Sequence, residues 1–127
     1  MEQITKREER ILVMEKLYTY DMMDDYIFLD QFDDYTDYVT ELVNYVCAHL
    51  TAIDEVISAS LVNYSLKRLS FVDRAIIRMS TAEMMRGLAA TIAINEALEI
   101  VKEYSDQGDG ANVRFVNKVL DNIKKNL

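Results

Sequence analysis

The 127-residue sequence has no proline, and it has only three glycines and one cysteine. Proline and glycine are the residues that most often end helices and form tight turns. A chain with so few of them contains long uninterrupted segments and few of the turns that β-strands require. The composition therefore predicts an all-α fold, and the length predicts a single domain over residues 1–127.

The lone cysteine, Cys47, cannot form an internal disulfide, so nothing points to an oxidising compartment. The sequence also lacks the run of about 20 apolar residues that a membrane span needs. Its first ten residues, MEQITKREER, are polar and have no hydrophobic signal core. We therefore expect a cytoplasmic protein with no membrane partner.

Acidic residues outnumber basic ones, and the formal net charge of −8 argues against indiscriminate nucleic-acid binding. The charge is uneven along the chain. Residues 1–63 contain 14 acidic and 4 basic residues, a net charge of −10, whereas residues 64–127 contain 8 acidic and 10 basic residues, a net charge of +2. This distribution leaves room for a local basic surface in the second half and at the N-terminus.

The spacing of apolar residues predicts helices along most of the chain. The first runs from Thr5 to Tyr20, and Thr5 followed by Glu8 is the pattern of a capping box. The segment from Tyr35 to about Leu61 is one long helix or two helices end to end, with a restart at Thr51. Other helices are expected over residues 26–32, 71–85, 92–104 and 113–125, the last two capped by Thr91 and Asn112.

The helix expected over residues 71–85 has the clearest start. Ser70 is a suitable N-cap, and the carboxylate of Asp73 can reach back to the Ser70 amide. Apolar residues recur on one side of this helix and arginines on the other: Val72, Ala75, Ile76, Met79 and Ala82 against Arg74, Arg78 and Arg86. The pattern predicts a helix that is buried on one side and cationic on part of the other.

Three features that could carry chemistry do not fit any known site. The aspartate-rich stretch 21–37 lacks the glycine that a calcium-binding EF-hand loop needs, so a solvated loop is expected there. Cys47 and His49 are two residues apart on a helix and point to different sides, which excludes a catalytic pair. The GDG at residues 108–110 lacks the lysine of a phosphate-binding loop. We expect no catalytic residue, no metal and no cofactor.

Three blocks occur in a fixed order along the chain. They are LKRL at residues 66–69 with VDRAIIR at 72–78, then AINEA at 93–97, and FVNKVLD at 115–121. Together they resemble the bacterial antitermination factors of the NusB family. The resemblance implies an all-α bundle of about six or seven helices in two packed subdomains, without enzymatic activity.

The resemblance also implies a function and its partners. NusB proteins pair with NusE, a small-subunit ribosomal protein, and the pair binds the boxA element of nascent RNA. This holds the RNA polymerase elongation complex in a termination-resistant state, notably on ribosomal RNA operons. The resemblance therefore implies a transcription antitermination factor that binds NusE and boxA-like RNA, and contacts polymerase indirectly.

Site residues follow from the family positions that this sequence matches. In the family, the basic first helix and the start of the last helix contact RNA, and the partner face lies around the central helix. The matching RNA-binding positions are Lys6, Arg7, Arg10, Tyr18, Phe115, Asn117 and Lys118. The candidate NusE contacts, taken as exposed, are Asp73, Arg74 and Ile77.

Two departures keep alternatives open. Glu8 and Glu9 stand where the family motif is usually basic or small, and two carboxylates there would repel phosphate. The first helix could thus be a solvated turn of mixed charge, and the chain a NusB-fold protein-interaction module with weak or lost RNA binding. Phe115 suits base stacking or ordinary core packing.

An enzymatic alternative is also open to the fold. A NusB-like domain precedes the catalytic domain in some ribosomal RNA methyltransferases. Because this sequence ends at Leu127 with no cofactor-binding segment, we do not expect that activity. The RNA sequence recognised and the choice between monomer and homodimer stay open.

Overall fold

The computed structural model describes residues 3–127, and this part of the chain is all helical, without strands, as predicted. It contains five α-helices, fewer than the six or seven expected, and one short 3-10 helix. The elements are α1 (Lys6–Met23), α2 (Asp37–Ser60), η1 (Leu66–Arg68), α3 (Phe71–Met85), α4 (Ala90–Tyr104) and α5 (Ala111–Asn126). No helix among these residues is both long enough and apolar enough to span a membrane.

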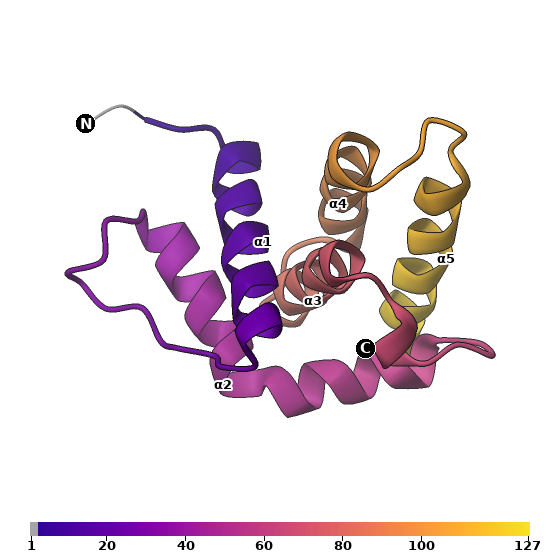
Figure 1. Ribbon diagram of the computed structural model, residues 1–127, viewed down its shortest axis with the longest axis horizontal. Coiled ribbons are helices and arrows are strands. Elements are labelled where there is room, and N and C mark those ends of the chain that lie inside the picture. Colours follow the sequence, from indigo (N-terminus) through magenta and orange to yellow (C-terminus); the bar gives the residue numbers. More distant parts are fainter. Residues whose placement is uncertain (1–2) are drawn as a thin grey trace.

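Helix α3 lies at the centre of the molecule, with α1 and the first half of α2 on one side and α4 and α5 on the other (Figure 1). All residues from Asp73 to Glu83 are buried. The predicted cationic side of α3 is therefore wrong for Arg74 and Arg78, which neighbouring helices cover, whereas Arg86, just after the helix, is exposed. One hydrophobic cluster includes residues of all five α-helices, so the expected two subdomains share a single core.

Helix α2 changes direction in its middle, where His49 has non-helical backbone angles (φ −122°, ψ 22°). The predicted break, at Thr51, was two residues too late. Beyond the bend, the second half of α2 runs below α3 towards the end of α5 (Figure 1). The side-chain amide of Asn122 donates to the Ser60 carbonyl at 3.3 Å and joins these two helices.

The helix expected over residues 26–32 is absent, and residues 24–36 form an ordered loop instead. Aspartate side chains in this segment bond to nearby backbone amides: Asp30 accepts from Phe32 at 2.8 Å, and Asp33 accepts from Asp30 at 2.8 Å. Such local bonds compete with helix formation. The side chain of Asn44 on α2 also binds both the N–H and the C=O of Leu29, which removes them from any helix.

The predicted helix starts are confirmed at α1 and α3. Thr5 and Glu8 form the capping box, and the Ser70 hydroxyl accepts from the Asp73 amide at 3.1 Å. The Asp73 carboxylate, however, does not reach back to Ser70. It accepts from Ser105 Oγ at 2.7 Å and from Asn112 Nδ2 at 3.0 Å, and so ties the start of α3 to α4 and α5.

The starts of α4 and α5 differ from the sequence prediction by two residues each. Their N-caps are Ala89 and Gly110, rather than Thr91 and Asn112, and neither N-cap residue makes a side-chain cap bond. At α5 the carboxylates of Asp109 and Asp106 accept instead from the amides of Ala111 and Val113, at 3.0 and 3.4 Å. Gly110 has a φ of 77°, a left-handed conformation that glycine adopts without strain. Asn112 therefore lies inside the first turn of α5, where its amide is free to bind Asp73 and Ser105.

Candidate nucleic-acid interface

The first turn of α1 presents two exposed basic side chains, Lys6 and Arg7, as the sequence predicts. Lys6 Nζ lies 3.3 Å from Glu9 Oε1 and 3.8 Å from the centre of the Tyr38 ring. Arg7 Nε donates to Glu96 Oε2 of α4 at 3.0 Å, and this bond, followed by the charge of Glu96, raises the pKa of Arg7. Both cations can reach solvent, but each is already next to a carboxylate.

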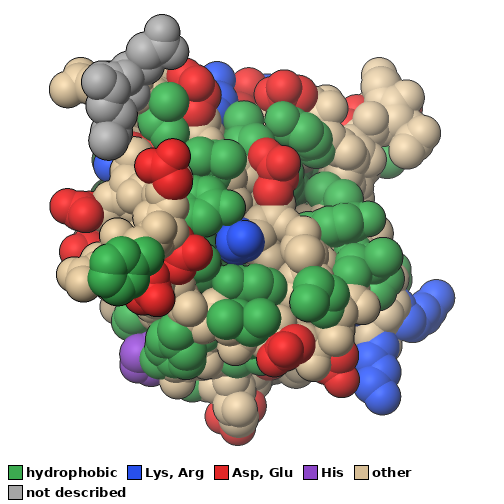
Figure 2. All heavy atoms as spheres, turned by 60° about the vertical axis from the view of Figure 1, so that its left-hand side comes forward, with side chains coloured by type: hydrophobic (Ala, Val, Ile, Leu, Met, Phe, Trp, Pro, Cys, Tyr) green, Lys and Arg blue, Asp and Glu red, His purple; other side chains and the backbone are tan. Residues whose placement is uncertain are grey.

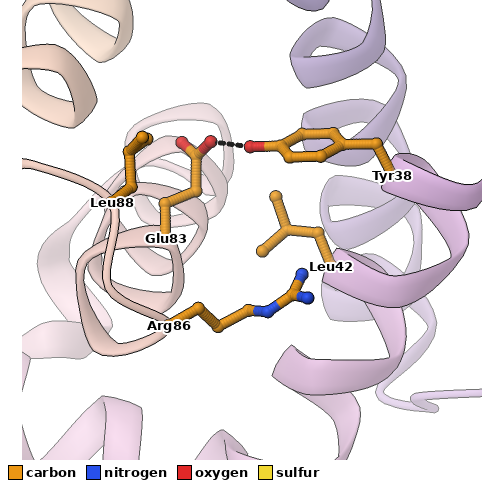
Figure 3. Close-up of a pocket in the computed structure, with 5 residues that line it drawn as sticks. All are labelled: Tyr38, Leu42, Glu83, Arg86 and Leu88. Carbon is orange, nitrogen blue, oxygen red and sulfur yellow. Dashed lines mark hydrogen bonds between the residues drawn. The ribbon is translucent and has the colours of Figure 1, made fainter.

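Arg10, one helical turn further, is buried. Its Nε donates to Glu83 Oε2 at 2.9 Å, and the Tyr38 hydroxyl donates to the same oxygen. Figure 3 shows Tyr38 and Glu83 pointing towards each other across a small pocket that Arg86 also lines. Burial, followed by the bond to Glu83, raises the pKa of Tyr38. Arg10 thus has a structural role in this fold and is not the exposed phosphate ligand that the sequence predicts.

Glu8 and Glu9, which depart from the family motif, both have local structural partners. The Glu8 carboxylate accepts from the Thr5 amide at 3.2 Å and completes the capping box of α1. Glu9 is buried, accepts from the Thr36 hydroxyl at the start of α2, and pairs with Lys6. Both residues therefore have a structural role in the fold.

Tyr18 lies on an exposed part of α1, beside a surface groove of about 410 Å³. Its ring packs edge-on against Phe71, with 6.1 Å between ring centres. Tyr104, at the end of α4, lines the same groove. Sequence reasoning identified Tyr18 but missed Phe71 and Tyr104, since nothing in the sequence shows that three helices bring these rings to one surface.

The other predicted RNA contacts lie on α5. Asn117 and Lys118 are exposed, whereas Phe115 is half-buried and its ring packs against Tyr64, with 5.3 Å between centres. The guanidinium carbon of Arg68 lies 4.8 Å from the centre of the Tyr64 ring. Phe115 thus combines core packing with partial exposure. Sequence reasoning missed Tyr64 and Arg68, although the LKRL block gave a signal for the second.

The predicted RNA contacts do not form one cluster. Helix α1, which carries Lys6, Arg7 and Tyr18, lies on one side of α3 and α4, and α5, which carries Phe115 and Lys118, lies on the other (Figure 1). A ligand that touches both groups has to cross the surface between these helices. Extended single-stranded RNA is able to follow such a path, whereas a small molecule is not.

The three candidate NusE contacts are not exposed, which corrects the sequence prediction. The exposed fractions are 7% for Asp73, 9% for Arg74 and 0% for Ile77. Arg74 Nε donates to Asp21 Oδ2 at 2.6 Å, and Asp73 binds residues of α4 and α5. These side chains are occupied inside the protein, because residues 73–83 of α3 are buried.

Comparisons with known proteins agree with the blocks seen in the sequence. A model of the NusB family matches residues 7–125. Transcription antitermination protein NusB of Bacillus velezensis is 42% identical over 89 residues, which are 68% of this chain and 66% of that relative, just under two-thirds of its length. The protein of the same name from Staphylococcus aureus strain MRSA252 is 30% identical over 132 residues, which cover 96% of this chain and 100% of that relative.

Solved structures give the same fold. A structure of T. maritima NusB has a TM-score of 0.79 and 28% identity, and the match covers 98% of this chain and 93% of that one. A crystal structure of antitermination factors NusB and NusE in complex with dsRNA has a TM-score of 0.78 and 24% identity, with coverage of 96% and 97%. At 24% identity the second likeness supports the fold alone.

Proposed function

The chain belongs to the NusB family, and we propose that it acts as a transcription antitermination factor. With NusE, it binds boxA-type RNA and helps the RNA polymerase elongation complex resist termination, notably on ribosomal RNA operons. The observation that carries this proposal is the family match over residues 7–125, almost the whole chain. The function is one of binding in the cytoplasm and requires no catalytic residue and no cofactor.

We place the RNA contacts on the members of the predicted set that are exposed or half-buried: Lys6, Arg7, Tyr18, Phe115, Asn117 and Lys118. Lysine and arginine contact phosphates, and the exposed parts of aromatic rings stack on bases. The positive charge is small, because Lys6 and Arg7 each lie beside a glutamate. A weak surface of this kind becomes sufficient when NusE adds its own, since joining two binding surfaces raises their effective concentration.

The NusE contact has to use other residues than the three predicted ones. In the family this face lies around the central helix, and in this chain Phe71 is the residue of α3 with the most exposed side chain. We propose Phe71 as the part of α3 that meets NusE. We also propose that residues 1–127 act as one domain, because a single hydrophobic cluster joins all five α-helices.

The competing possibility is a NusB-fold module that contacts proteins and has lost RNA binding. It was motivated by Glu8 and Glu9, and both now have structural roles in capping α1 and binding Thr36. The family match over residues 7–125 favours the antitermination function. The remaining ground for the alternative is the pairing of Lys6 and Arg7 with carboxylates. The pair of Arg7 with Glu96 is exposed and therefore weak, whereas Lys6 pairs with the buried Glu9.

The test is RNA binding by the purified chain, with and without NusE from the same organism. A boxA-like RNA and a scrambled RNA are compared over a series of salt concentrations. Binding that is tighter with NusE, selective for boxA and weakened by salt is the expected result. Complex formation with NusE without any RNA preference would favour the protein-contact module, and failure to bind either partner would leave only the fold.

A further inference from the structure

The loop of residues 24–36, which joins α1 to α2 and is here called the acidic loop, exposes three large apolar side chains. The exposed fractions are 49% for Ile27, 57% for Phe28 and 85% for Phe32. Just before the loop, Met22 and Met23 at the end of α1 are exposed as well. Apolar side chains that gather at the surface and are rimmed by polar groups mark interaction sites more often than chance.

The exposure of Phe28 follows from the way the loop is anchored on either side of it. Leu29 is buried, and its N–H and C=O bind the side-chain amide of Asn44 at 2.7 and 2.8 Å. The Tyr26 hydroxyl accepts from Arg78 Nη1 at 2.6 Å. With Tyr26 and Leu29 fixed inwards, Phe28 is held outwards. A surface that is already held in place loses little conformational entropy when it binds.

The segment itself carries charge of one sign, although Lys16 of α1 lies 5.3 Å from the Tyr35 ring at its end. Residues 21–37 contain seven aspartates and no lysine, arginine or histidine. Asp21 is used inside the protein, by Arg74, while the other six are exposed: Asp24, Asp25, Asp30, Asp33, Asp34 and Asp37. Figure 2 turns this side of the molecule forward, and hydrophobic side chains lie among acidic ones there. The surface repels phosphates, and it also repels an identical acidic loop on a second copy.

We propose that the acidic loop binds a basic, amphipathic segment of a partner protein. The apolar side of the segment packs on Ile27, Phe28 and Phe32, and its lysines or arginines face the surrounding carboxylates. Apolar contact supplies most of the affinity in such a complex, while charge complementarity supplies orientation and a fast association rate. This contact is separate from the RNA and NusE binding of the proposed function, and it uses none of the residues assigned to either.

The experiment is a titration of the isotope-labelled full chain, followed by the amide signals in NMR spectra. The probes are two synthetic peptides of leucine and lysine, about 15–20 residues long, with identical composition. One places the leucines on a single helical face and the other is scrambled. The helical-face peptide is expected to shift the signals of residues 24–36, and the scrambled peptide to bind at least about tenfold more weakly, the factor that corresponds to one buried apolar side chain.

Three variants sharpen the result. Phe32→Ser is expected to weaken binding about tenfold, since it removes the most exposed apolar side chain of the loop. Asp25→Asn with Asp34→Asn removes two exposed charges whose side chains make no hydrogen bond within the described residues, and it should weaken binding about threefold at low salt. The matched control is Val62→Ser, an exposed apolar residue in the loop after α2, which should change nothing.

Several outcomes would overturn the proposal. Equal binding of the two peptides would mean that charge alone acts, and equal loss in the Val62→Ser control would mean non-specific contact. Shifts outside the acidic loop would place the site elsewhere. Shifts of residues 24–36 on raising the protein concentration would assign the surface to a second copy, and the same shifts with boxA-like RNA would assign it to RNA. The RNA measurement of the proposed function is unaffected by any of these results.

Discussion

The basic residues of this chain fall into two groups with opposite surroundings. Arg10, Arg74 and Arg78 are buried, and each holds a carboxylate of another element, whereas Lys6, Arg7 and Lys118 reach solvent. We call these groups the inner arginines and the outer cations. The comparison teaches that counting basic residues overstates the positive charge that RNA can reach, because the inner arginines are used to hold helices together.

The inner arginines are stable only because their charge is fully matched. Arg78 donates to both oxygens of Asp54 at 2.8 Å and to the Tyr26 hydroxyl at 2.6 Å. Burial by itself lowers the pKa of Arg78, but the bonds and charge of Asp54 outweigh it, so the pKa is raised. Among the described residues, every buried side-chain nitrogen and oxygen has a hydrogen-bond partner. Removing one member of such a set leaves an unmatched buried charge.

The largest effect is expected for Arg10→Met. This change leaves the Glu83 carboxylate buried with only the Tyr38 hydroxyl as a partner, and it should lower the free energy of unfolding by about 3 kcal/mol. RNA affinity of the folded protein should stay within about twofold. Urea unfolding and RNA binding at low temperature measure the two quantities. If Arg10→Met kept normal stability but lost RNA binding, Arg10 would have to be counted among the outer cations, as a residue that contacts RNA.

An intermediate effect is expected for Tyr26→Phe, which removes the hydroxyl that accepts from Arg78. The loss of this bond should cost about 1 kcal/mol near neutral pH. Burial raises the pKa of Tyr26 to about 12, so the folded protein resists ionisation of this group. The stability that depends on the neutral hydroxyl is complete below the unfolded pKa of about 10 and is lost as the pH rises towards 12.

The stability difference between the wild type and Tyr26→Phe should therefore shrink from about pH 10 upwards, because the variant lacks this ionisation. Tyr20, whose pKa burial also raises to about 12, titrates in both proteins and cancels in the difference. Urea unfolding of both proteins at several pH values between neutral and about 11 measures this stability difference. A stability difference that stays constant across this range would show that the ionisation of Tyr26 is not coupled to its bond with Arg78.

The smallest effect on stability is expected for Arg7→Met, the matched control for Arg10→Met. Because the pair of Arg7 with Glu96 is exposed, urea unfolding should be unchanged. Affinity of the NusE complex for boxA-like RNA should fall about threefold to tenfold, and the salt dependence should decrease by about one phosphate contact. Lys124→Met, a change at an exposed residue near the end of α5, should alter neither the RNA affinity nor its salt dependence. An equal loss of RNA affinity in Arg7→Met and Lys124→Met would mean that the outer cations act only through the overall charge of the protein and make no specific phosphate contact.

The helical class and the starts of α1 and α3 could be predicted from the sequence, but the starts of α4 and α5 and the surroundings of the charged residues could not. Thr5, Glu8 and Ser70 act within three residues of their own positions, and the structure confirms them as caps. Arg10 and Glu83 are 73 residues apart, so no local pattern announces their contact. The same reason explains why exposed arginines were expected on α3. The helix expected in the acidic loop was wrong for two reasons, the local bonds of Asp30 and Asp33 and the more distant anchor through Asn44.

The sequence by itself determined that the chain is helical, where α1 and α3 begin, and which family blocks it carries. Each of these depends on hydrogen bonds and apolar spacing within one or two helical turns, which neighbouring residues define. Only the tertiary structure decided that residues 73–83 of α3 are buried, which cations remain in solvent, and that Asn44 holds residues 24–36 as a loop. The reason is that burial and ion pairing depend on elements that meet only when the whole chain packs around α3.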